Sequence, residues 1–154
     1  MKSRLIINAL LAVALIVLGF IIVLKPNPKN AGPSALVAIN SPDIKTITIK
    51  RKDNDSLHFS LENGHWVIDQ PIQAPALLGK IERLLKIAQI KPPVSYPLEG
   101  ISLDNFGLLD PKVSIQFNSS SLNIGLSESV HSRRYVSDHQ QLYLLDDTFL
   151  HHLT

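Results

Sequence analysis

The chain contains no cysteine among its 154 residues, and it has only one methionine and one tryptophan. The absence of cysteine excludes disulfides, thiolate zinc sites and cysteine nucleophiles, and it leaves the redox compartment undetermined. A strong charge of one sign is also missing, because 15 Lys and Arg residues face 13 Asp and Glu residues for a formal net charge of +2. This balance argues neither for nucleic acid nor for an acidic substrate as a partner.

Sequence motifs that carry chemistry are equally scarce. There is no Gly-x-Ser-x-Gly elbow of a serine hydrolase, and no glycine-rich run links a strand to a helix as a phosphate-binding loop does. Residues 53–55 look like the start of a calcium loop, but the glycine and the late glutamate of such a loop are absent. His151 and His152 are adjacent and lack the i, i+4 spacing of two metal ligands on one helix face. We therefore expect a non-enzymatic protein with no catalytic residues, no metal and no small-molecule cofactor.

The apolar residues are concentrated at the N-terminus. Residues 5–24 are twenty consecutive uncharged residues, and a helix of this length at about 1.5 Å per residue spans the roughly 30 Å hydrocarbon core of a bilayer. A signal peptide has a shorter apolar core of roughly 7–15 residues. Because residues 31–32 offer small side chains, a cleaved peptide stays open as the alternative. We predict one transmembrane helix that binds the lipid bilayer through residues 5–24.

Charges beside this run set its expected orientation. Lys2 and Arg4 precede it, while Lys25 and Lys29 follow it, so the positive-inside bias slightly favours a cytoplasmic N-terminus. We expect residues 1–4 to be a cytoplasmic stub and residues 25–40 to be a stiff stalk rich in proline. Residues 41–154 would then form a periplasmic domain of a bacterial inner-membrane protein.

The first half of this domain has the pattern of three strands and a helix. β-Branched residues at 44–51, alternation at 57–61 and a strand at 65–69 after Asn63-Gly64 predict a meander with one tight hairpin. Apolar residues then repeat at helical spacing, at Leu77, Leu78, Ile81, Leu84, Leu85 and Ala88. Pro75 suits the first helical turn, and residues 92–97 read as an extended link.

The second half repeats the hairpin pattern. Residues 103–111 predict a short helical turn closed by Gly107. Two alternating apolar sets then predict a hairpin: Val113, Ile115 and Phe117, followed by Leu122, Ile124 and Leu126. Residues 134–137 and 142–145 predict a further strand pair, and Asp146 or Asp147 is expected to cap a last helical turn. The predicted fold class is α+β, with about seven short strands in antiparallel hairpins packed on one amphipathic helix.

Several short motifs occur together in a suggestive order. They are Gly64-His65-Trp66 before Pro71, then residues 106–111 (FGLLDP), residues 122–125 (LNIG) and residues 134–136 (RYV). Together they resemble a bacterial membrane-anchored domain-of-unknown-function family with Gly-x-Trp, yGLxxP, lxiG and rYV motifs. That family includes auxiliary proteins of gliding-motility-type ABC transporters. The resemblance covers roughly residues 44–150 in a single copy, and it implies an envelope accessory protein without catalytic residues of its own.

Four residues are candidates for a structural or interaction role. Trp66 is expected to anchor the core, with ligand stacking as the alternative, and Tyr135 is a second candidate for contact with a ligand. Gly107 is expected to end a helical turn, and Gly125 to serve a bulge or a close contact. The leading hypothesis is a scaffold or accessory subunit of a membrane complex, such as one associated with an ABC transporter. The alternative is a periplasmic module that binds lipid, glycan or peptidoglycan fragments at a concave site containing Trp66 or Tyr135.

A small basic cluster completes the candidates. It consists of Lys45, Lys50, Arg51 and Lys52. Lysines that protect an exposed edge strand are one interpretation, and contact with anionic lipid headgroups is the other.

Overall fold

The computed structural model describes residue 11 and residues 35–128 and 130–153. The chain divides into two compact units, Met1–Gly32 and Pro33–Thr154. The predicted transmembrane helix at 5–24, apart from Leu11, and the predicted stalk up to residue 34 lie outside the described residues. Within the part that is described, no helix combines the length and the apolar character needed to cross a membrane.

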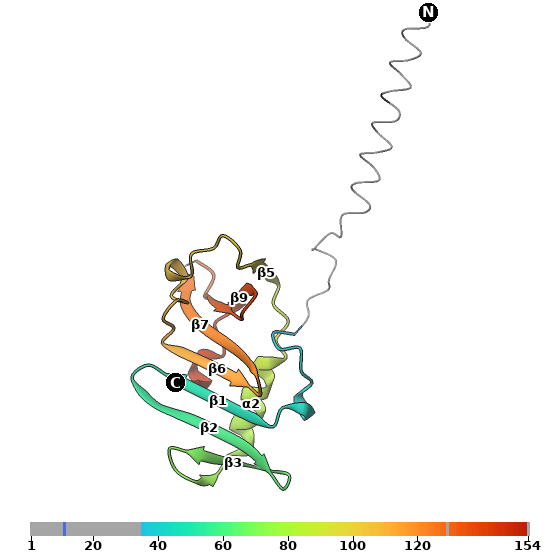
Figure 1. Ribbon diagram of the computed structural model, residues 1–154, viewed down its shortest axis with the longest axis vertical. Coiled ribbons are helices and arrows are strands. Elements are labelled where there is room, and N and C mark those ends of the chain that lie inside the picture. Colours follow the sequence, from blue (N-terminus) through green and yellow to red (C-terminus); the bar gives the residue numbers. More distant parts are fainter. Residues whose placement is uncertain (1–10, 12–34, 129, 154) are drawn as a thin grey trace, which may run out of the picture. The chain divides into compact units, whose positions relative to one another are not determined.

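The second unit is built on one antiparallel sheet, in which nine strands are described (Figure 1). The strand order is β4-β3-β2-β1-β6-β7-β8-β9-β5. The strands are β1 (Thr46–Arg51), β2 (Asn54–Glu62), β3 (His65–Gln70), β4 (Ala74–Pro75), β5 (Val94–Pro97), β6 (Val113–Phe117), β7 (Ser120–Glu128), β8 (Arg133–Ser137) and β9 (Gln141–Asp146). The predicted meander and both later hairpins are confirmed. In the first hairpin, Asn63 and Gly64 have the positive φ angles of 49° and 82° that such a turn requires.

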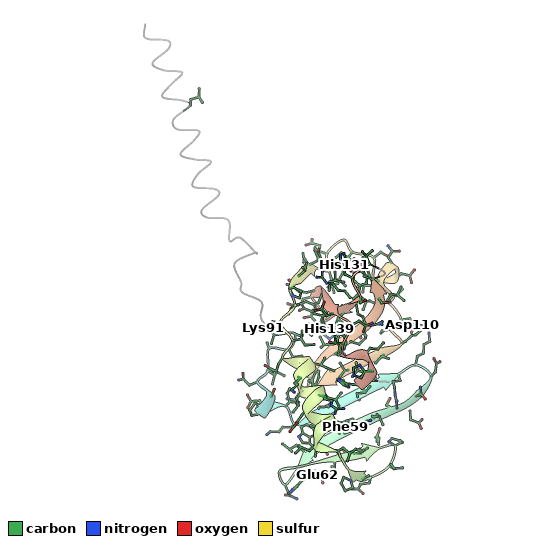
Figure 2. All side chains as sticks on the ribbon, turned by 180° about the vertical axis from the view of Figure 1, so that it is seen from behind. Phe59, Glu62, Lys91, Asp110, His131 and His139 are labelled. Atoms are coloured by element: carbon green, nitrogen blue, oxygen red, sulfur yellow. The ribbon has the colours of Figure 1, made fainter. Side chains whose placement is uncertain are left out.

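The helix α2 (Leu78–Ala88) packs on one face of this sheet. It lies behind the strands in Figure 1 and in front of them in Figure 2, which shows the opposite side. The prediction of an α+β domain with antiparallel hairpins on one amphipathic helix is therefore confirmed for this unit. The strand count of seven was too low, because two short strands at the ends of the sheet were not predicted.

The buried stripe of α2 differs from the predicted one. Its buried residues are Ile81, Leu84, Ile87 and Ala88. Leu77 and Leu78 were predicted to share the apolar face, but they are 72% and 65% exposed. The helix begins only at Leu78, so that Leu77 is extended and does not share the helical phase. Leu78 lies about 100° around the helix from the centre of the stripe, which leaves it at the margin.

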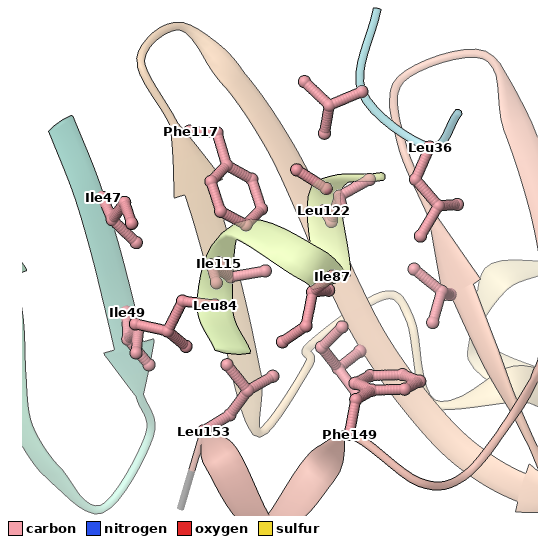
Figure 3. Packing of buried hydrophobic residues seen from close by; sticks show 14 of the residues in the cluster. Leu36, Ile47, Ile49, Leu84, Ile87, Ile115, Phe117, Leu122, Phe149 and Leu153 are labelled. Atoms are coloured by element: carbon pink, nitrogen blue, oxygen red, sulfur yellow. The ribbon is translucent and has the colours of Figure 1, made fainter. Parts of the chain in front are cut away.

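The core lies between α2 and the sheet. Figure 3 shows Leu84 and Ile87 of the helix among apolar side chains of β1 and β6 and of the C-terminal residues Phe149 and Leu153. The sheet contributes several fully buried residues to this layer, among them Ile47, Ile49, Ile115, Phe117 and Leu122. Burial of each such side chain contributes about 1.5–3 kcal/mol to stability.

The folded unit begins before residue 41. Leu36 and Val37, which were assigned to the stalk, are 5% and 2% exposed and belong to the core. Their N–H groups donate to the carbonyl oxygens of Ile90 and Ala88 at 2.9 and 3.1 Å. Carbonyl groups at a helix C-terminus lack partners within the helix. Residues 36–37 supply these partners, so the predicted boundary at 40/41 was wrong.

Both ends of the sheet are short strands that contain proline. Pro75, predicted for the first helical turn, pairs with Val67 in β4 instead. Residues 94–97, predicted as a link, form β5 and pair with β9. Proline lacks the N–H group that the outer side of an edge strand would offer. The proline-rich segments are thus compatible with edge positions, and they hinder the addition of a further strand.

Three short 3-10 helices connect these elements in the described ranges: η2 (Ser41–Asp43), η3 (Leu103–Phe106) and η4 (Leu150–His152). The predicted cap of the last turn was wrong. The residue at the N-cap of η4 is Phe149, and its side chain makes no capping hydrogen bond. Asp147 is held by an arginine of the sheet instead.

Candidate functional site

Three of the four predicted residues lie together at one corner of the sheet, where η3 meets β7 and β8. The ring of Tyr135 stands edge-on to that of Phe106, with centroids 4.7 Å apart and an interplanar angle of 62°. A Cβ atom on Gly125 would lie 2.3 Å from the carbonyl oxygen of Phe106, and one on Gly107 would lie 2.7 Å from Cγ of Leu126. We call these five residues the Tyr135 corner.

Local sequence explains how this corner forms. Gly107 ends η3 in the left-handed conformation, with φ 64°, and its N–H donates to the carbonyl oxygen of Asp104 at 3.0 Å. Only glycine adopts this conformation without steric cost. In β7, the pairing with β8 shifts register between Ile124 and Ser127, which places a bulge at residues 125–126.

The bulge also overturns one prediction. Leu126 was expected to face the core with Leu122 and Ile124, since the three residues alternate. It is 54% exposed, whereas Ile124 is buried. A bulge adds a residue to one strand and resets the alternation beyond it. Leu126 therefore faces outward beside Gly107.

An ion pair that was not predicted from the sequence contacts this corner. Arg134 donates from Nε to Oδ1 of Asp147 at 2.8 Å and from Nη2 to Oδ2 at 2.6 Å. It also donates from Nη1 to the carbonyl oxygen of Gly125 at 2.7 Å. Both charged side chains are mostly buried, with 14% and 19% exposed. The two residues are 13 positions apart, and no periodic pattern links them.

Trp66 stands apart from the Tyr135 corner. It lies on β3, and the strands β2, β1 and β6 separate β3 from β7. Its side chain is half-buried and packs against the hydrophobic core. The four predicted residues thus do not converge on one site.

A polar chain crosses the first three strands, away from this corner. The hydroxyl of Thr48 is hydrogen-bonded to Nδ1 of His58 at 2.8 Å, and Nε2 of His58 lies 3.6 Å from Oδ2 of Asp69. The order hydroxyl, imidazole, carboxylate is that of a catalytic triad. Thr48 and His58 are direct cross-strand partners, and the distance to Asp69 exceeds that of a hydrogen bond. Cross-strand stabilisation therefore accounts for this chain.

The predicted basic cluster is largely engaged in local contacts. Lys52 forms an ion pair with Asp110, and this hydrogen bond and charge raise the pKa of the Lys52 ammonium group. Arg51 donates to the carbonyl oxygen of Asp55, and Lys45 donates to that of Pro42, both at 3.0 Å. Arg51 and Lys45 thus bond to backbone carbonyl groups close by in the sequence, whereas Lys52 pairs with a carboxylate 58 residues further along the chain.

Among the residues that the structure describes, no group of three or more His, Cys, Asp or Glu side chains is arranged to hold a metal ion. Comparisons of the chain with family models, curated proteins and solved structures found no match. The family resemblance seen in the short motifs stays a prediction.

Proposed function

We propose that the protein is a non-enzymatic accessory subunit of a membrane complex, tethered by residues 5–24 with its domain in the periplasm. The observation that carries this proposal is the uncharged run of twenty residues, placed shortly before a folded unit whose core begins at Leu36. A run of this length matches the thickness of a bilayer core.

Tethering would act by raising the local concentration of the domain at its partner. Eleven residues, 25–35, separate the apolar run from Leu36, and a chain of this length reaches about 35–40 Å when fully extended. The partner surface must then lie close to the membrane. We infer that the partner is itself a membrane protein.

The Tyr135 corner is the surface that best suits such a contact. Leu126 is 54% exposed beside Gly107, and Leu109, two residues after Gly107, is 69% exposed. The ion pair between Arg134 and Asp147 ties β8 to the segment that follows β9. Tyrosine and arginine are enriched among the interface residues that contribute most to binding energy. Tyr135 belongs to this corner, and Arg134 contacts the carbonyl oxygen of Gly125 within it. The proline-containing edge strands make side-chain contact more suitable than strand addition.

The alternative, a module that binds lipid, glycan or peptidoglycan fragments, was expected to use Trp66 or Tyr135. Two hollows in the described part of the domain are lined by other residues, mostly from α2 and the C-terminal segment. Neither Trp66 nor Tyr135 lines these hollows. A ligand of this class would therefore have to bind at the residues of α2 and the C-terminal segment that do line them.

Affinity purification of the tagged full chain from detergent-solubilised membranes of its host tests the proposal. We expect a stoichiometric membrane partner, recovered in at least tenfold lower yield with the double variant Leu109→Ser, Leu126→Ser. The control is Leu77→Ser, since Leu77, at the N-cap of α2, is 72% exposed and is not part of the Tyr135 corner. Recovery of the protein alone, or an equal loss with the control, would contradict the proposal.

A further inference from the structure

A basic hollow lies between α2 and η4, on the side of the domain that faces the viewer in Figure 2. It consists of two adjoining depressions of about 210 and 110 Å³ that share Arg83 and His152 in their walls. Its basic lining residues are Lys80, Arg83, Lys86, His151 and His152. We refer to these two depressions together as the basic hollow.

The arrangement follows from helical spacing. Lys80, Arg83 and Lys86 are three residues apart on α2, so their side chains project along one side of the helix. The chain packs η4 against α2, and this places His151 and His152 beside the same row. Basic residues from two separate segments are thereby brought to one depression, where the two histidines add positive charge only when they are protonated.

Among the residues that the structure describes, none of those lining this hollow is acidic. Other basic residues of the domain have carboxylate partners, such as Lys52 with Asp110 and Arg134 with Asp147. In residues 35–128 and 130–153, by contrast, the three basic residues of α2 form no ion pair. Glu82, the acidic residue of α2, is exposed and lies outside the lining. Like charges held together without a counterion cost stability, which a bound anion would recover.

The hollow also has an apolar wall. Ile87, Ile90 and Phe149 line the larger depression, and Thr148 is a further lining residue. Burial lowers the pKa of His152, and the nearby positive charges of His151, Arg83 and Lys80 lower it further. A guanidinium group offers paired donors that fit the oxygen atoms of a phosphate group.

We propose that the basic hollow binds a tetrahedral oxyanion of the phosphate class. Arg83 and Lys86 contact the oxygen atoms, His152 and Thr148 add donors, and the apolar wall accommodates the carbon part of a phosphate ester. The anion is supplied either by a lipid headgroup or by a soluble phosphate compound. This binding goes beyond the tethered contact at the Tyr135 corner and does not depend on it.

Titration of the full chain in neutral detergent micelles, followed by the imidazole resonances of His151 and His152, tests the proposal. One arm uses inorganic phosphate, and the second uses phosphatidylglycerol against phosphatidylcholine in mixed micelles. We expect saturable shifts in at least one arm. Saturation by phosphatidylglycerol at a lower concentration than by inorganic phosphate indicates a lipid source, and the reverse order indicates a soluble one.

The variants Arg83→Gln and Lys86→Gln should each weaken binding about tenfold, as expected for the loss of a charge-assisted hydrogen bond. Lys50→Gln removes the same charge from an exposed position on β1 and should change the affinity less than about twofold, as expected for a distant screened charge. Unchanged melting temperatures would show that the variants fold. Absence of saturable shifts in both arms, or an equal loss with Lys50→Gln, would overturn the proposal, because the attraction would then be absent or unspecific. Neither result would bear on the tethered contact, which is measured by partner recovery.

Discussion

Gly125 and Phe106 approach so closely that a methyl group on Gly125 would lie 2.3 Å from the carbonyl oxygen of Phe106. This oxygen belongs to the backbone, so it cannot move away as a flexible side chain would. The same methyl group would lie 2.9 Å from Cγ of Leu108, a residue that is 1% exposed. The contact joins η3 to the bulge in β7, and it explains why glycine occupies this position.

Replacing Gly125 by alanine should therefore destabilise the domain by about 2–3 kcal/mol, a typical cost of overpacking. Gly79→Ala is the matched control, since a Cβ atom there meets nothing within 4 Å. Because alanine favours helices, this control should stabilise the domain by about 0.5–1 kcal/mol. Urea unfolding of the full chain in neutral detergent measures both changes. Equal effects of the two substitutions would contradict the close approach.

Neighbouring arginines on β8 allow a second comparison. Arg134→Ala leaves the carboxylate of Asp147 without its bidentate partner in a mostly buried position, and we expect a loss of about 2–3 kcal/mol. Arg133 lies 3.5 Å from Asp146, whose side chain is 75% exposed. Arg133→Ala should therefore cost less than about 1 kcal/mol, as is usual for an exposed pair. The free energy of unfolding of the two variants, each compared with the unmodified chain, tests this difference. A larger loss with Arg133→Ala than with Arg134→Ala would contradict the role assigned to Arg134.

Tyr143 should remain neutral in strongly alkaline solution. Burial raises the pKa of its hydroxyl above the ordinary value of 10.0, and the hydrogen bond to Asp138, 2.7 Å long, raises it further. A pKa raised by folding stabilises the protein below pH 10, and this contribution is lost progressively as the pH rises further.

Absorbance of tyrosinate measures this effect. The chain has three tyrosines, and Tyr143→Phe should leave the absorbance change up to about pH 11.5 unaltered, since Tyr143 does not ionise in that range. Loss of about one third of the change in this variant would show that Tyr143 ionises normally.

Anion binding at the basic hollow should strengthen as the pH falls. In the free protein, burial and the charges of His151, Arg83 and Lys80 lower the pKa of His152. A bound anion favours the protonated imidazole, so binding takes up a proton and the affinity rises below about pH 6.5. Sulfate is the suitable probe, because its own charge is constant.

The control for this pH dependence is a histidine outside the hollow. His152→Gln should flatten the affinity profile of sulfate between about pH 7.5 and 5.5, whereas His58→Gln should leave it unchanged, since His58 contacts Thr48 and Asp69 on the sheet. A profile that is the same in all three proteins would exclude His152 as the titrating group.

Local patterns predicted most elements of the domain. Alternating apolar residues gave the hairpins, and Asn63-Gly64 gave the tight turn, because these signals act over a few residues. The edge strands were missed for a physical reason. β4 and β5 contain proline, which is unfavourable within a sheet, and only the tertiary fold shows that these segments lie at its edges.

Contacts between residues far apart in the chain could not be predicted from the sequence. The side chain of Asn118 accepts from the N–H groups of Lys45 and Thr46 at 2.8 and 3.1 Å and donates to the carbonyl oxygen of Asp43 at 3.0 Å. The sequence indicated only that Asn118 lies in a turn. The basic hollow was missed likewise, because His151 and His152 reach α2 through tertiary packing across about 70 residues of chain.

The most direct test of the central claim is the topology of the full chain in its membrane. The chain has no cysteine, so single cysteines can be labelled without interference. Asn54→Cys places one on an exposed site of the domain, and Ser3→Cys places one before the apolar run. The account predicts that a membrane-impermeant maleimide labels intact spheroplasts at residue 54 and labels residue 3 only after the membrane is opened. Labelling of residue 3 but not residue 54 in intact spheroplasts, or recovery of the protein free of membranes, would contradict it.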